Sequence, residues 1–275
     1  MNVTLEKWRK LYTLGLLGFL LWGEQKKANR ATNLLTCIPG DGTRNKDASR
    51  SDFSTVINYS VCGALSLDEL VRFGASSKTI YLPEGRVLVR DGDVEDFIFS
   101  VTNGCLKSFK QLPDGRRQVT GFYFPCDFIG LADSDVYLAD IEAVSDAGLC
   151  CMERKSLNAL SRDIPNLERR LHELAPKALA ELQGQIVLLG RKTAQERVAT
   201  FLRMLLKRSF ERGVTANPVS IPMICEDIAD FLGLTKETFS RTFSTLRKLK
   251  LIGPDVDKTV ELLDRDGLQR VAEGF

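Results

Sequence analysis

Between about residues 78 and 152 the chain alternates short runs of β-branched and aromatic residues with turn residues. The runs TIYL, RVLVR, FIFSV, CLKSFKQL and RQVTGFYF are each followed closely by Pro, Gly, Asp or Asn. In RVLVR and QVTGFYF, apolar and polar residues partly alternate, which gives a strand one buried face. Several strands at this spacing predict a small antiparallel barrel or sandwich.

After Pro165 the pattern changes to a long helical run, NLERRLHELAPKALAELQGQIVLLG, which ends at Gly190. Its apolar residues recur at three, four and seven positions and form a narrow stripe of the coiled-coil kind. The stripe predicts a dimer seam made by Leu171, Ala175, Ala178, Leu182 and Leu189. Pro176 lies inside the run and is expected to kink it. The alternative left open is a helix packed on its own domain.

A second helical run begins at Thr193, with Glu196 three residues later in the pattern of a capping box. Further on, the segment DIADFLGLTKETFSRTFSTLRKLKLI contains two short helical patterns separated by Gly233. Glycine permits a tight turn, and Thr235 is a suitable N-cap for the helix that follows. Two helices joined in this way predict a helix-turn-helix.

In the second of these helices Phe239, Phe243 and Leu246 recur at helical spacing and are expected to anchor it. The opposite face is polar, and arginine and glutamate there suit guanine and cytosine edges in the major groove. The predicted DNA contacts are Thr235, Lys236, Glu237, Thr238, Ser240, Arg241 and Arg247. The downstream LIGPDVDKTVELL predicts a β-wing. An ordinary helical hairpin with solvated charges is the alternative.

The composition, with 275 residues, 44% hydrophobic and 27% charged, allows two ordinary domains. The net charge of +2 is uninformative as a total, but residues 191–250 hold twelve basic and six acidic residues. A basic C-terminal module suits a polyanion such as double-stranded DNA, although a solvated surface gives the same pattern.

The seven cysteines form no CxxC pair and their number is odd, which favours a reducing, cytoplasmic compartment. The single histidine, His172, argues against a Ser/His/Asp hydrolase and rules out a His-rich metal site. Gly-rich phosphate loops and convincing paired carboxylates are missing from the sequence, so we expect no enzyme.

Residues 1–60 are expected to be a flexible extension. Their first part carries a short apolar core between basic flanks without a cleavage site, which indicates neither secretion nor a membrane span. An amphipathic helix on a partner or membrane surface and an upstream extension of the reading frame remain open, and no membrane partner is predicted.

Three stretches of the chain carry a resemblance to a known family: LPDGRRQVTGFYFPCDFIGL, VLLGRKTAQERVATFL and IPMICEDIADFLGLTKETFSRTFSTL. The chain resembles the regulators grouped around the cyclic-AMP receptor protein and FNR, and among these it resembles the FixK subgroup. The resemblance implies an α+β fold: a β-roll of the cyclic-nucleotide-binding, jelly-roll type (61–164), a dimerisation helix (165–190) and a winged helix-turn-helix (191–275). It also implies an activator that works with promoter DNA, a second copy of itself and RNA polymerase.

The FNR-like pattern Glu-x-x-Ser-Arg appears here as Glu237, Ser240 and Arg241. By this resemblance the dimer reads a palindrome whose half-site contains TTGA, with Arg241 on the guanine and the other two on neighbouring bases. A module that binds a small molecule and acts through protein contacts is the competing interpretation.

Cyclic-nucleotide members of this family have Gly-Glu and a later arginine where this chain reads CDFIGLADSDVYLADIEAV, so cyclic nucleotide is not expected. Oxygen sensors of the family hold an iron-sulfur cluster on four cysteines, yet serines stand here at the earlier positions, Ser51 and Ser54. We therefore predict no cofactor. A cluster using Cys37, Cys62, Cys150 and Cys151 is the alternative, and Cys225 is a candidate redox thiol beside the less specific interpretation of a residue without a role.

Overall fold

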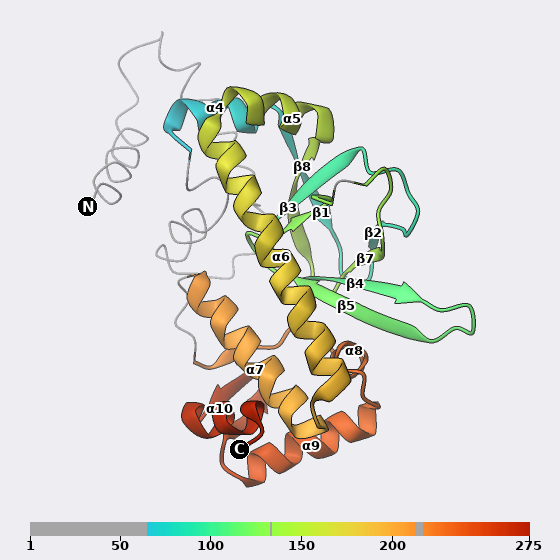
Figure 1. The fold of residues 1–275 in the computed structure, drawn as a ribbon, viewed down its shortest axis with the longest axis vertical. Coiled ribbons are helices and arrows are strands. Elements are labelled where there is room, and N and C mark those ends of the chain that lie inside the picture. The colour runs from blue at the N-terminus through green and yellow to red at the C-terminus, as the bar shows by residue number, and fades with distance from the viewer. Residues whose placement is uncertain (1–64, 133, 213–216) are drawn as a thin grey trace.

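The computed structural model describes residues 65–132, 134–212 and 217–275, and its β-rich region folds into two antiparallel sheets of four strands each (Figure 1). In spatial order the first sheet contains β1 (Ser77–Leu82), β8 (Ala147–Glu153), β3 (Phe97–Asn103) and β6 (Phe128–Ile129). The second contains β2 (Val87–Val89), β7 (Asp140–Ala143), β4 (Leu106–Gln111) and β5 (Arg117–Tyr123).

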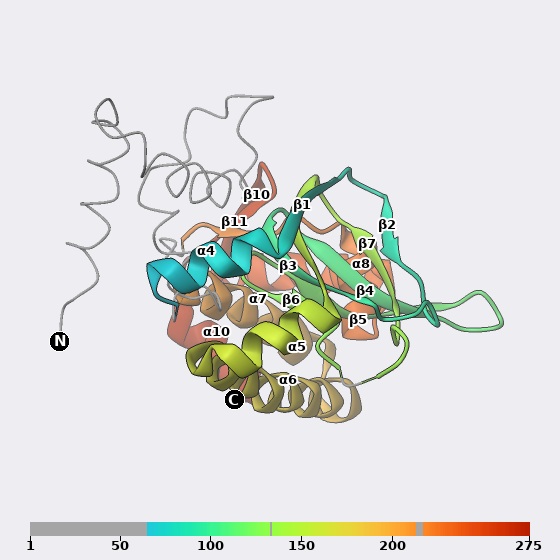
Figure 2. The same ribbon diagram turned by 90° about the horizontal axis from the view of Figure 1, so that it is seen from above.

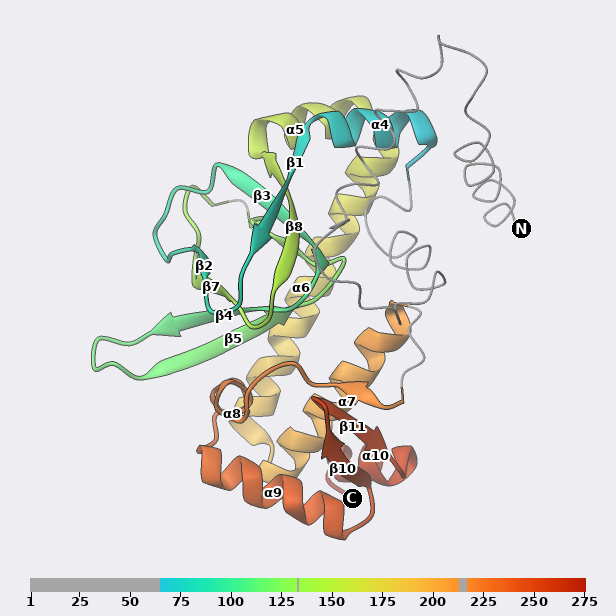
Figure 3. The ribbon, with the colours of Figure 1, turned by 180° about the vertical axis from the view of Figure 1, so that it is seen from behind.

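Apolar side chains from both sheets share one core, which holds the β-roll together. Phe99 and Leu149 come from the first sheet, and Leu106 and Ile141 from the second, and each is at most 6% exposed. The β4–β5 hairpin extends from the edge of the second sheet, as Figures 1 and 3 show. The predicted sandwich of short strands is therefore present, with the hairpin available for contacts outside the roll.

Three helices accompany the roll: α4 (Leu67–Ala75), α5 (Arg154–Asp163) and α6 (Pro165–Arg191). The first two were not predicted from the sequence; they lie together at one end of the roll beside the start of α6 (Figure 2). Pro165 occupies the first turn of α6, where proline needs no amide hydrogen. The helix then runs through Pro176 without a break, along the β-roll and on to the C-terminal region (Figure 1).

The C-terminal region contains α7 (Ala194–Glu211), β9 (Val219–Ser220), α8 (Cys225–Leu232), α9 (Lys236–Lys248), β10 (Ile252–Val256), β11 (Thr259–Leu262) and α10 (Arg265–Glu273). The capping box of Thr193 and Glu196 at the start of α7 is confirmed. β10 and β11 form the predicted wing, with a turn in which Asp257 and Lys258 both have positive φ angles. α10 was not predicted.

One apolar cluster joins the roll to the C-terminal region. The rings of Phe122 on β5, Phe201 on α7 and Phe231 on α8 pack together, with centroids 5.3–6.3 Å apart. All three side chains are buried. The helix-turn-helix is thus attached directly to the β-roll as well as through α6.

The fold, a β-roll followed by a long helix and a winged helix-turn-helix, confirms the predicted α+β class. Among the described helices, none is long and apolar enough to cross a membrane. The predictions about residues 1–60, including Cys37, Ser51 and Ser54, and about Cys62 lie outside the described residues.

Candidate DNA-binding site

The turn between α8 and α9 has the geometry that its sequence predicts. Gly233 ends α8 with a φ of 60°, and a Cβ there would approach Cδ2 of Leu189 to 3.0 Å. The amide of Leu234 donates to the carbonyl of Ala229 at 2.9 Å. The Thr235 hydroxyl then accepts from the Thr238 amide at 3.2 Å and caps α9. Backbone and cap together fix the angle between the two helices.

The two faces of α9 differ as predicted. Phe239 and Leu246 are buried in the domain core, Phe243 packs beside them, and Thr242, which was not predicted, is also buried. On the other face the structure leaves exposed Thr235, Lys236, Glu237, Ser240, Arg241, Ser244 and Arg247, while Thr238 is half-buried. The predicted contact residues, apart from Thr238, therefore form one accessible surface, which we call the reading face.

The reading face carries exposed charges of both signs. Hydrogen bonds from its own backbone amide and from the Thr235 hydroxyl lower the pKa of the Glu237 carboxyl, so it is an ionised acceptor at neutral pH. In the described part of the chain the Arg241 guanidinium forms no ion pair. Its donors are therefore available to a ligand. Arg247 lies over the Phe243 ring at 5.8 Å.

Cations near the reading face extend its positive charge. Lys248, the last residue of α9, and Lys250, two residues later, are exposed, and Lys258 is exposed at the turn of the wing. Sequence reasoning did not single out these lysines as contacts; the available signal for Lys258 was a lysine within the hairpin turn DVDKTV. Exposed lysines beside a recognition helix suit phosphate oxygens.

A single arginine joins α6, α7 and the helix-turn-helix. Arg197, in the first turns of α7, donates to the carbonyls of Leu189 and Leu232 at 2.9 Å each, of Lys192 at 2.8 Å and of Gly233 at 3.2 Å. These oxygens belong to helix ends or to the turn, where carbonyls lack a partner within the helix. We call this arrangement the Arg197 joint.

The predicted dimer stripe on α6 is divided by the fold. Leu171 and Leu189 are half-buried and pack against their own chain, whereas Ala175, Ala178 and Leu182 are exposed. Three apolar side chains absent from the prediction are exposed as well: Leu179 (58%), Ile186 (72%) and Val187 (54%). The uncovered apolar stripe therefore lies in the middle and second half of α6.

The stretch CDFIGLADSDVYLADIEAV, which corresponds to the phosphate-binding segment of cyclic-nucleotide members, is bonded to other parts of the chain. Arg154 donates to the Glu95 carboxylate and to the carbonyls of Gly130 and Ala132. The Tyr137 hydroxyl donates to the Phe97 carbonyl at 2.6 Å. The arginine and the tyrosine of this region are thus engaged by the chain itself.

The described cysteines occupy different environments. Cys150 packs towards α6, whereas Cys151 packs towards the core between the sheets, because neighbouring residues of a strand point to opposite faces. The two thiols therefore lie on opposite faces of β8. Burial raises the pKa of the Cys105 thiol to about 12. Cys225 is exposed at the first position of α8.

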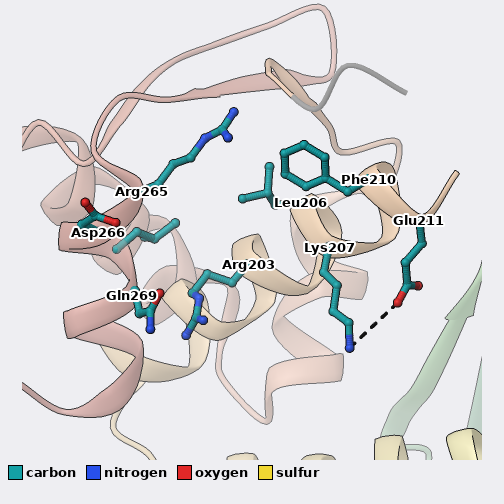
Figure 4. A pocket seen from close by; sticks show the side chains of 9 residues that line it. Arg203, Leu206, Lys207, Phe210, Glu211, Arg265, Asp266 and Gln269 are labelled. Atoms are coloured by element: carbon teal, nitrogen blue, oxygen red, sulfur yellow. Dashed lines mark ion pairs between the residues drawn. The ribbon is translucent and has the colours of Figure 1, made fainter. Parts of the chain in front are cut away.

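A groove of about 400 Å³ lies between α7 and α10 (Figure 4). Leu206 and Phe210 supply apolar surface, and the Arg265 guanidinium lies 5.5 Å from the Phe210 ring centroid. Its lining mixes cations with the carboxylates of Glu211 and Asp266. None of the predicted DNA contacts lines this groove.

Comparison with known proteins agrees with this architecture. Residues 79–163 match the cyclic nucleotide-binding domain and residues 196–271 the Crp-like helix-turn-helix domain. The chain is 33% identical over 231 residues to the transcriptional activator protein FnrA of Stutzerimonas stutzeri, covering 83% of this chain and 92% of FnrA. It is 35% identical over 188 residues to the nitrogen fixation regulation protein FixK of Bradyrhizobium diazoefficiens, covering 68% and 79%.

The structure of FixK2 from Bradyrhizobium japonicum is similar to this one with a TM-score of 0.66 and 30% sequence identity, over 71% of this chain and 96% of FixK2. The two family matches and the similarity to FixK2 thus cover both domains, their order along the chain and the long helix between them. The chain belongs to the Crp/Fnr family of DNA-binding transcription regulators.

Proposed function

We propose that this protein is a homodimeric transcription activator that reads a two-fold promoter site through α9. The observation that carries the proposal is the exposure of Glu237, Ser240 and Arg241 together on the reading face. Arginine can donate two parallel hydrogen bonds to guanine O6 and N7, and an ionised glutamate accepts from cytosine N4. Arg241 is assigned to the guanine of a TTGA half-site, and Glu237 and Ser240 to neighbouring bases.

The activator role rests on the relatives, since FnrA is named a transcriptional activator. An activator of this kind has RNA polymerase as its partner at the promoter. The resemblance to FNR and FixK in the reading residues supports the TTGA half-site.

The test is binding of the full chain to a duplex with two TTGA half-sites, followed by fluorescence anisotropy. Arg241→Ala is expected to remove preference for the guanine, worth about 1–3 kcal/mol. The matched control is Lys155→Ala, which removes one exposed positive charge from α5 at the other end of the molecule. A preference for guanine that survives in Arg241→Ala contradicts the assignment and favours a module that acts through protein contacts.

The second copy is proposed to cover the exposed stripe of α6. Leu179, Leu182 and Ile186 recur at three and four residues, which is the spacing of a coiled-coil seam. Leu182→Asp combined with Ile186→Asp is expected to give monomers in sedimentation velocity, whereas Gln183→Asp beside the stripe leaves dimers. A double variant that remains dimeric excludes this seam.

We further propose that DNA binding requires neither a cyclic nucleotide nor an iron-sulfur cluster. The intrachain bonds of Arg154 and Tyr137 and the opposite faces of Cys150 and Cys151 support this. Binding is expected to be the same with and without cyclic AMP, and in air and under nitrogen. A brown, iron-containing protein that binds DNA only without oxygen overturns this part of the proposal.

A further inference from the structure

Charged side chains are buried where the β-roll meets the helix-turn-helix. Nζ of Lys107, on β4, lies 2.9 Å from both carboxylate oxygens of Asp227 on α8 and 3.0 Å from Oε1 of Glu142 on β7. Lys107 is 5% exposed and Asp227 3% exposed. The lysine and the aspartate therefore lose almost all contact with water and have one another as partners.

A second cation from the same hairpin reaches the same helix. The Arg117 guanidinium on β5 donates to Oδ1 of Asp227 at 2.8 Å and to Oδ2 of Asp230 at 2.9 Å. Burial alone would lower the pKa of Arg117, but its hydrogen bond to Asp230 and the charge of Asp227 raise the pKa above its ordinary value. The Gln118 amide adds a bond to the Asp230 carbonyl. We call Lys107, Arg117, Glu142, Asp227 and Asp230 the α8 clamp.

The clamp acts on α8, and α8 determines where α9 lies. Three residues join the two helices, and each is held by hydrogen bonds: the amides of Gly233 and Leu234 donate to carbonyls of α8, and Thr235 caps α9. Figures 1 and 3 show α8 beside the base of the β4–β5 hairpin and α9 beyond it, on the side away from the roll. Since the reading face is exposed in this arrangement, the clamp holds the helix-turn-helix with its DNA contacts free.

Ion pairs are a poor way to gain stability at such an interface, because burying both charges costs about as much as their attraction returns. Apolar residues of the same volume would often stabilise the folded protein at least as much. Charged partners differ from apolar ones in fixing direction: hydrogen bonds to two carboxylates on successive turns of α8 define both its rotation and its position along the hairpin.

We infer that Lys107 and Arg117 are positioning residues for DNA reading: from the β-roll they hold α8 and thereby set the place of α9 for the second half-site. The inference rests on the proposed function. A two-fold protein reads half-sites a fixed distance apart, so the two α9 helices have to be held in register. Loosening the clamp allows each α9 to shift while its own side chains remain unchanged.

The experiment uses the full chain and three duplexes: two TTGA half-sites at the preferred spacing, the same half-sites with a longer spacer, and the preferred spacing with the guanines replaced. The variant is Arg117→Gln. Its matched control is Arg116→Gln, which removes the neighbouring charge of the same hairpin from a side chain that is 77% exposed and bonds only Asp114. Asp230→Asn provides a second, isosteric way to break the clamp, and thermal melts check folding.

Arg117→Gln and Asp230→Asn are each expected to weaken binding at the preferred spacing by about tenfold and to reduce the preference for that spacing by a similar factor. The guanine preference stays, because Arg241 is intact. The slope of log K against log salt also stays, because the clamp touches no phosphate. The double variant is expected to lose little more than Arg117→Gln alone, because Arg117→Gln already removes the bond to Asp230 together with the bond to Asp227.

The inference is overturned if Arg117→Gln and Asp230→Asn both bind DNA as Arg116→Gln does, or if either binds more tightly than the wild type. A lower salt slope in Arg117→Gln overturns it as well, because Arg117 would then be a phosphate contact. A wild-type protein without any spacing preference overturns it too. A wild-type protein without guanine preference instead contradicts the proposed function. The two proposals therefore fail in different measurements.

Discussion

The reading face of α9 and the α8 clamp contain the same residue types, yet the fold uses them in opposite ways. On the reading face, Lys236, Glu237 and Arg241 are exposed. In the clamp, Lys107 and Asp227 are almost fully buried and are bonded to each other. A charge left in water is available to a ligand, whereas a buried charge is committed to its partner and fixes geometry. Burial, more than residue type, thus separates the proposed contact residues from the proposed positioning residues.

The largest expected difference between the clamp and the reading face is in their contribution to folding stability. Asp227→Ala leaves the buried Lys107 with only Glu142 and is expected to lower the free energy of unfolding by about 3–5 kcal/mol. Glu237→Ala removes an exposed carboxylate and is expected to change it by less than about 0.5 kcal/mol. Urea unfolding followed by circular dichroism measures both. Equal effects of the two substitutions would remove the distinction.

A second prediction concerns base preference. Glu237→Gln keeps the shape of the side chain but removes its charge, and is expected to reduce discrimination at the base it contacts by about 1–3 kcal/mol. Because the pKa of Glu237 is lowered, the carboxylate stays ionised as pH falls, so the wild-type preference is expected to be constant from about pH 8 to about pH 5.5. Binding to duplexes substituted at each half-site position tests this. A preference that disappears within that range contradicts it.

Salt dependence separates the two regions by a smaller effect. Arg247→Ala removes a cation from the exposed side of α9 and is expected to reduce the salt slope by about one. Lys107→Met removes the same charge from the clamp and is expected to leave the slope at its wild-type value. Anisotropy titrations at four or more salt concentrations give both slopes. A lower slope in Lys107→Met would place the lysine on the DNA.

The smallest expected effect concerns thiols. Cys105, with its pKa raised to about 12 by burial, stays protonated at pH 8 and is expected to be alkylated last, whereas the exposed Cys225 reacts early. Charged iodoacetate on Cys225 is expected to weaken DNA binding by less than about tenfold, and neutral iodoacetamide by less still. Peptide mass spectrometry follows the order of reaction. Cys225→Ser serves as the control and should be insensitive.

Local rules predicted the helix-turn-helix well. The Thr235 cap, the turn at Gly233 and the anchoring Phe239 and Leu246 depend on neighbours within a few residues, so the sequence contains their full cause. The wing was predicted for the same reason, because its two strands and their turn are neighbours in the sequence. The short helices α4, α5 and α10 were missed, because their apolar faces are brief and gain meaning only from the surfaces they cover.

The clamp and the α6 stripe show what a sequence pattern omits. Lys107 and Asp227 are 120 residues apart, and nothing in either segment indicates the other. On α6, periodicity correctly indicated apolar faces but could not say which one the chain itself covers. Leu171 and Leu189 pack against their own chain, whereas Leu179 and Ile186, which were not predicted, belong to the exposed apolar stripe.

The Arg197 joint has a consequence for how such a protein acquires a new target. All four of its acceptors are main-chain oxygens, so the joint is indifferent to which side chains α8 and α9 carry. The residues at 237, 240 and 241 can therefore be exchanged while the frame that presents them is retained. For protein engineering, the joint that supports α9 is thus separate from the three side chains proposed to contact the bases. Libraries restricted to these three positions are expected to vary sequence preference without redesign of the joint.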